Sequence, residues 1–79
     1  SDVSIKNILS DLESVKIGDT VLITGSNSAQ YVYKVTEIRD MKAEYLPHVI
    51  GANAESLIIY KAKNLLRTQL YMLIAKPVL

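Results

Sequence analysis

The first fifteen residues carry apolar side chains at a helical spacing. Between Ser4 and Val15 these side chains fall at i, i+3, i+4, i+7 and i+10, which places them on one stripe of a helix. The stripe consists of Ile5, Ile8, Leu9, Leu12 and Val15. Asp2 or Ser4 can cap the first turn, and Gly18 lies just beyond the stripe. We predict an amphipathic helix over residues 4–15 that docks on its own domain, with docking on a partner as the alternative, because so short a helix is marginal in water.

After Lys16 the apolar residues alternate, which is the spacing of a strand. Ile17, Val21 and Ile23 fall on one face of an extended segment, and their branched side chains suit a pleated surface. The polar, glycine-led residues 25–30 are typical of a hairpin loop, and residues 31–38 are again rich in strand-forming types. Residues 17–38 therefore predict a β-hairpin.

The middle of the chain has a weaker pattern. Residues 39–42 predict a turn, and residues 43–50 predict a third strand. Pro47 would restrict this strand to a sheet edge or break it, because proline lacks the backbone donor. Residues 51–53 predict a turn that closes the segment.

The last third supports two interpretations. As strands, residues 56–62 and 68–78 are apolar runs joined by a single helical turn at residues 63–67. As one helix capped by Asn53, the segment has an apolar stripe formed by Ile59, Ala62, Leu66, Leu70 and Leu73. We prefer strands, because a half-exposed helix would leave several apolar residues of both runs in water. Pro77 fits the end of an edge strand in either case.

These elements predict one domain over residues 1–79, with a helix at 4–15 and a small barrel-like β body at 16–79. Two domains would leave both cores too small in a chain of 79 residues. The expected fold is mainly β with an N-terminal helix (α+β), arranged as a small antiparallel barrel or a strongly bent sheet. The alternative is an α+β fold with a long C-terminal helix.

Composition removes several classes of protein. The chain has no cysteine, so no disulfide or thiolate zinc site stabilises it, and we expect a cytoplasmic protein. No run approaches the length of apolar residues that a membrane span needs, and no secretory signal is visible, so no membrane partner is expected. The net charge of +1 argues against a dedicated duplex-DNA binder, although residues 55–79 are mildly basic and residues 1–20 mildly acidic.

The residues that carry catalytic chemistry are few. His48 is the only histidine, and without cysteine a metal site would need carboxylates from distant positions. Asp40 and Glu44 are flanked by Arg39 and Lys42, so ordinary ion pairing accounts for them. The loop at residues 25–30 lacks the Gly-Lys-Ser/Thr ending of a phosphate loop. We therefore expect no enzyme, no catalytic or metal-binding residues and no cofactor.

Residues 15–25, with Gly18-Asp19-Thr20-Val21 entering a strand, and the strand at 31–38 resemble the opening of SH3-like small barrels of the KOW type. Residues 63–67 look like the single helical turn before the last strand of such barrels. The resemblance covers about half of the chain, and the second strand lacks the glycine of the KOW pattern. It implies an SH3-like barrel acting as a binding module in nucleic-acid or ribonucleoprotein machinery, or docking onto protein.

Two sets of residues are candidates for contact with a partner. Tyr31 and Tyr33 share a strand face and could stack on unpaired bases beside cations, or could cover a core that has no Phe or Trp. The candidate nucleic-acid or partner surface comprises Tyr31, Tyr33, Lys34, Lys61, Lys63 and Arg67. The candidate protein-docking residues are Ile5, Ile8, Leu9, Leu12, Leu70 and Met72.

The sequence thus leaves two functions open, both non-catalytic. The first is a phage or bacterial accessory module, associated with transcription or translation, that docks onto a protein or nucleoprotein complex and contacts single-stranded nucleic acid. The second is an assembly component or inhibitor that works only through protein contacts, by adding a strand to a partner's sheet or by forming a homo-oligomer.

Overall fold

The computed structural model describes residues 2–78, which form one mixed sheet with helices on both faces. The strands are β1 (Asp2–Ser4), β2 (Thr20–Thr24), β3 (Gln30–Lys42), β4 (Leu57–Ala62) and β5 (Gln69–Pro77). Their order across the sheet is β1-β2-β3-β5-β4, with β1 parallel to β2 and the other neighbours antiparallel. The fold is therefore mainly β within an α+β class, and the sheet is open rather than closed into the barrel that the sequence suggested.

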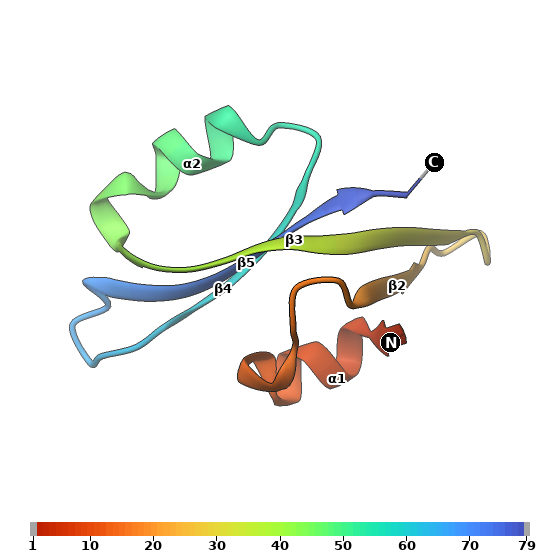
Figure 1. Cartoon of the computed structure of the whole chain (residues 1–79), viewed down its shortest axis with the longest axis horizontal. Helices are drawn as coiled ribbons and strands as arrows, with labels where there is room; N and C mark the ends of the chain where they lie inside the picture. Colours follow the sequence, from red (N-terminus) through yellow and green to blue (C-terminus); the bar gives the residue numbers. More distant parts are fainter. Residues whose placement is uncertain (1, 79) are drawn as a thin grey trace.

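The helices lie on opposite faces of the sheet (Figure 1). One face is covered by α1 (Ile5–Ser10) and the short 3-10 helix η1 (Leu12–Ser14). The other face is covered by the 3-10 helix η2 (Ala43–Tyr45) and α2 (Leu46–Ala52). Within residues 2–78, no helix has the length and apolar character needed to cross a lipid bilayer.

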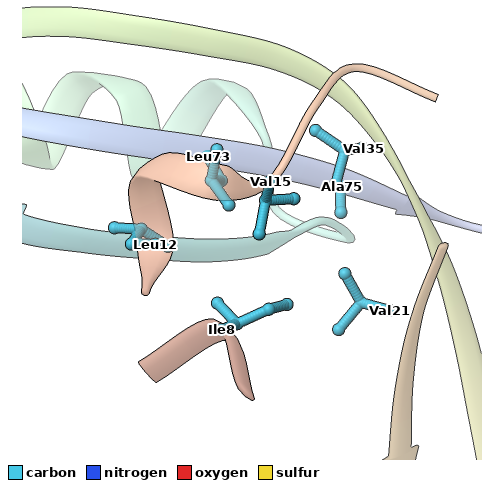
Figure 2. Close-up of a cluster of buried hydrophobic side chains, with 7 residues drawn as sticks. All are labelled: Ile8, Leu12, Val15, Val21, Val35, Leu73 and Ala75. Atoms are coloured by element: carbon cyan, nitrogen blue, oxygen red, sulfur yellow. The ribbon is translucent and has the colours of Figure 1, made fainter. Parts of the chain in front are cut away.

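The larger core lies between α1, η1 and the sheet. Figure 2 shows side chains from α1 and η1 facing side chains from β2, β3 and β5 across this layer. Its buried members are Ile8, Leu12, Val15, Val21, Val35, Leu73 and Ala75. The smaller core on the α2 face contains Val49, Met72 and Ile74. Because β5 is central and covered on both faces, its side chains are buried almost continuously, which explains the apolar run in its sequence.

The N-terminal helix docks on its own domain, as predicted, but it is shorter than predicted. α1 begins after Ser4, whose hydroxyl accepts a hydrogen bond from the Asn7 N–H at 3.3 Å. It ends at Ser10, because Asp11 leaves the helical region with φ −150° and ψ 73°. The chain then continues as η1, which keeps Leu12 buried.

The predicted hairpin at residues 17–38 is confirmed by the pairing of β2 with β3. Its loop is closed by the Gly25 N–H, which donates to the Ala29 carbonyl at 2.8 Å. The turn predicted at residues 39–42 is wrong, because β3 continues through these residues and pairs with β5. A bulge between Val35 and Glu37 shifts the register inside this long strand.

The third strand predicted at residues 43–50 is also wrong, because η2 and α2 occupy this segment. Pro47 lies in the first turn of α2, where a backbone donor has no helical acceptor and its loss costs little. The buried side chain of Val49 then holds α2 against the sheet.

The strand interpretation of the last third is confirmed by β4 and β5, and no long C-terminal helix forms. The linking residues 63–68 form a turn instead of the predicted helical turn. Pro77 ends β5, which is a central strand and not the edge strand expected. Proline is tolerated there because β4 ends its pairing at Leu57 opposite Ala75, before Pro77 is reached.

Candidate functional site

The sheet has two edge strands, and β4, with six residues, is the longer of them. It pairs only with β5, whereas the opposite edge, β1, has three residues. An edge strand exposes a row of backbone donors and acceptors, which is a template for pairing with another chain. The candidate site is built around this strand.

The hydrogen-bond register shows which residues of β4 turn their backbone outward. The Lys63 N–H donates to the Gln69 carbonyl at 2.8 Å, which makes these residues a hydrogen-bonded pair. In an antiparallel ladder such pairs alternate, so Lys61, Ile59 and Leu57 also turn their backbone toward β5. Ile58, Tyr60 and Ala62 therefore direct their N–H and C=O groups away from the sheet.

A groove lies beside this edge on the α2 face. It is an open hollow of about 350 Å³ between the start of α2 and the β4–β5 hairpin. Its lining residues are Ala43, Leu46, Tyr60, Lys61, Ala62, Arg67 and Leu70. Most of these side chains are apolar, with Arg67 and Lys61 as the charged members. A strand laid along β4 would place alternate side chains in this groove.

A smaller hollow of about 60 Å³ flanks the edge on the α1 face. It is lined by Ile8, Leu9, Leu12, Ile59, Tyr60 and Lys61. Leu9 is 73 % exposed, so the α1 stripe is not completely covered by its own domain. The edge strand thus has apolar hollows on both of its faces, one for each set of side chains on an added strand.

The turn between β4 and β5 presents two leucines to solvent. Leu65 is 100 % exposed and Leu66 is 84 % exposed. The turn is nevertheless well bonded, because the Asn64 side-chain oxygen accepts from the Thr68 N–H at 3.0 Å and the Gln69 N–H at 3.2 Å. The Arg67 N–H also donates to the Asn64 carbonyl at 3.1 Å. Hydrogen bonding inside the turn holds both leucines away from either core.

Three of the four basic residues predicted as a partner surface, Lys61, Lys63 and Arg67, lie at this end of the molecule. Lys61 forms an ion pair with Glu13 at 2.5 Å, and Lys63 forms one with Asp40 at 2.9 Å. These pairs tie the hairpin to η1 and to β3. Arg67 has no ion pair among residues 2–78 and lines the groove. It has a left-handed backbone, with φ 56°.

The predicted tyrosine surface is far from these basic residues. Tyr33 packs against the larger core, whereas Tyr31 is half exposed. Lys34 follows Tyr33 in the strand and so points to the other face of the sheet. Tyr33 pairs with Pro77 and Lys61 with Tyr71, and these β5 positions are about 20 Å apart at the usual rise of a strand. The β2–β3 and β4–β5 turns also lie at opposite ends of the long axis in Figure 1.

The predicted protein-docking residues divide into interior and surface positions. Ile8, Leu12, Leu70 and Met72 are buried, at 0–5 % exposure, so they serve mainly to build the interior. Leu70 also borders the groove, and Ile8 and Leu12 border the small hollow. Their apolar spacing marked the covered side of α1 and a central strand, which requires burial from within the domain. Ile5 is partly buried against the larger core. Only Leu9 is strongly exposed.

The acidic and histidine side chains of the described part of the chain were candidates for a metal site. No group of three or more His, Cys, Asp or Glu side chains lies together within residues 2–78. His48 is exposed on α2, and Asp40 is used in its pair with Lys63. The hydrogen bond from Arg39 to Glu37, on the α2 face of β3, raises the pKa of Arg39.

Sequence reasoning missed Tyr60, Leu65 and Leu66 as surface residues. The signal was present at the turn, because turns favour Gly, Asn, Asp, Ser and Pro, and two adjacent leucines are unusual there. Tyr60 carried no such signal, because its half-exposed position depends on β4 being an edge.

Comparison of the chain with protein-family models, curated proteins and solved structures found no match. The site must therefore be interpreted from its own geometry.

Proposed function

We propose that this protein is a non-catalytic docking module that binds another protein chain along the β4 edge. The docking site consists of the outward backbone of Ile58, Tyr60 and Ala62, the groove on the α2 face, and the leucine tip formed by Leu65 and Leu66. The absence of cysteine fits a cytoplasmic setting for this contact.

The observation that carries the proposal is the leucine tip beside an unpaired edge. Leu65 and Leu66 are 100 % and 84 % exposed, so they bury no apolar surface that would stabilise the isolated domain. Their turn is hydrogen-bonded, so their exposure follows from a defined backbone. Exposed apolar side chains next to free strand groups are the combination that β-strand addition uses, with the backbone supplying affinity and the side chains specificity.

Contact with single-stranded nucleic acid has less support at this site. A nucleic-acid groove combines cations with stacking platforms. Here Lys61 and Lys63 are each paired with a carboxylate, and Tyr31 lies at the start of β3, whose opposite end pairs with the start of β5 beside the β4–β5 turn. We therefore assign protein, rather than nucleic acid, as the partner class.

Site-specific photo-crosslinking in the source cells tests this function. A photoreactive phenylalanine analogue at position 65 or 66 should give a discrete crosslinked protein species. The matched control places the same group at Ile17, which is 64 % exposed and precedes β2, a strand that β3 and β5 separate from β4. Equal labelling from all three positions, or none from 65 and 66, would show that the tip is not a docking site.

A double substitution separates binding from folding. Leu65→Ser combined with Leu66→Ser should abolish the crosslink formed from a probe at position 60. The free energy of unfolding should change by less than about 0.5 kcal/mol, because neither side chain is packed in either core. Ile17→Ser is the matched control and should leave the crosslink intact.

A further inference from the structure

We infer that the partner at this docking site is a second copy of the same chain, with the two β4 strands pairing antiparallel about a two-fold axis at Ile59. The inference rests on the proposed function, because it names the occupant of the same site. The result would be one continuous sheet across two copies, with the β4 edge removed from both.

The backbone pattern limits the registers that such a pair can adopt. Ile58, Tyr60 and Ala62 point outward, so hydrogen-bonded pairs across the new interface must join members of this set. A symmetric antiparallel pair also places one residue opposite its own copy. Near the middle of β4 this residue is Ile59, Tyr60 or Lys61.

Charge selects the register with its axis at Ile59. An axis at Lys61 would place two lysines directly opposite each other, which destabilises a strand pair. An axis at Tyr60 would place Lys63 opposite Leu57. An axis at Ile59 places Lys63, which also pairs with Asp40 of its own copy, opposite Glu55 of the other copy, and symmetry forms this contact twice. Glu55 is exposed and has no ion pair among residues 2–78.

The same register brings together the apolar side chains around the edge. On the α1 face, the two Ile59 side chains meet, with Leu9 beside each of them in the small hollow. On the α2 face, Tyr60 lies opposite Ile58 of the other copy and borders the groove that contains Leu46.

A second copy fits this edge because the two ends of the β4 segment carry opposite charges. Glu55 lies just before β4, Lys61 lies within it, and Lys63 and Arg67 follow it, so antiparallel self-pairing brings the acidic end of one copy to the basic end of the other. A chain of this size also buries a smaller share of its surface on folding than a larger domain does, and pairing adds burial without adding residues.

Substitution of Tyr60 by proline tests the pairing. Tyr60→Pro removes an outward N–H that no strand of the domain uses, so the fold should persist. Tyr60→Val is the matched control, because it loses the ring and keeps the donor. In sedimentation equilibrium, the natural chain and Tyr60→Val should be dimers at high micromolar concentration, and Tyr60→Pro should be a monomer.

Disulfide trapping tests the register without disturbing either core. The chain has no cysteine, so introduced thiols have no competitors. Residues 55 and 63 lie just outside the two ends of β4. In this register they face each other across the two copies at a non-hydrogen-bonded position, where a disulfide can bridge the two chains. Under mild oxidation, Glu55→Cys and Lys63→Cys should give a disulfide dimer when mixed and none when kept separate.

The outcomes distinguish this inference from the proposed function. A natural chain that stays monomeric at about 1 mM, or Tyr60→Pro dimers as stable as the natural ones, would overturn the self-pairing. Dimers without the mixed 55–63 disulfide would overturn the Ile59 axis. If self-pairing fails while position 65 still crosslinks to a different protein, the docking function stands with another occupant.

Discussion

At the scale of single residues, Gly18 shows how one backbone conformation positions a whole strand. Its φ is +96°, a region that L side chains adopt with strain. In this conformation its N–H donates to the Val35 carbonyl at 2.9 Å, which joins the entry to β2 with β3. No atom lies within 4 Å of a Cβ added at this position. The requirement for glycine is therefore conformational and not a matter of space.

We predict that Gly18→Ala lowers the free energy of unfolding by about 1 kcal/mol or more, because alanine must adopt a positive φ. Gly51→Ala is the matched control. Gly51 also has open space around it, but it lies inside α2 with an ordinary φ, so alanine should stabilise by about 0.5–1 kcal/mol. Urea denaturation followed by circular dichroism measures both. Changes of the same sign would contradict this explanation.

At the scale of elements, the β4–β5 turn depends on one side chain. Asn64 binds the Thr68 and Gln69 N–H groups through its side-chain oxygen and donates from its amide nitrogen to the Thr68 hydroxyl at 2.7 Å. These bonds fix the strand-to-strand connection and the direction of the leucine tip. The left-handed residue Arg67 completes the turn.

Asn64→Ala should therefore lower the free energy of unfolding by about 1 kcal/mol and speed amide exchange at Thr68 and Gln69. Asn64→Asp keeps the acceptor oxygens and loses only the amide donor, so exchange at these amides should stay close to that of the natural chain. Hydrogen exchange followed by NMR gives both results. Equal exchange rates in Asn64→Ala and the natural chain would mean that the backbone alone holds the turn.

The sequence predicted those elements whose pattern is local. Alternation at residues 17–38 and the apolar runs near the C-terminus gave the four long strands, and Ser4 was one of two predicted caps. α2 was missed because its seven residues bury only Val49 completely, which is too few for a helical period to stand out. The bulge at Val35 and β1 were missed because both depend on pairing with distant strands.

The candidate site was less predictable than the fold. The spacing identified apolar side chains that share one face of an element. It did not distinguish a face that the domain itself buries from a face exposed to a partner. Met72 and Leu70 have this ambiguity, which was resolved only by the central place of β5 in the sheet. The edge position of β4 follows from strand order, which is a long-range property. An exposed apolar turn was the only local clue to the site.

At the scale of the whole molecule, stability and association should be linked. The two cores lie on opposite faces of one sheet, and residues of both β5 and β4 contribute to each. Disruption of the β4 edge would therefore destabilise both cores. If two copies pair through β4, unfolding also separates them, and the folded state becomes more favourable as protein concentration rises. A monomer would show no such dependence.

We therefore predict that the melting temperature of the natural chain rises with its concentration. A tenfold increase changes the free energy of a dimer by about 1.4 kcal/mol, which corresponds to roughly 4 °C for a folding unit of this combined size. Tyr60→Pro should melt at a temperature that does not depend on concentration, and Tyr60→Val should follow the natural chain. Calorimetry over two decades of concentration measures the slope. A melting temperature of the natural chain that does not change with concentration would show that one copy alone accounts for the stability of the fold. The exposed leucines would then bind a different partner.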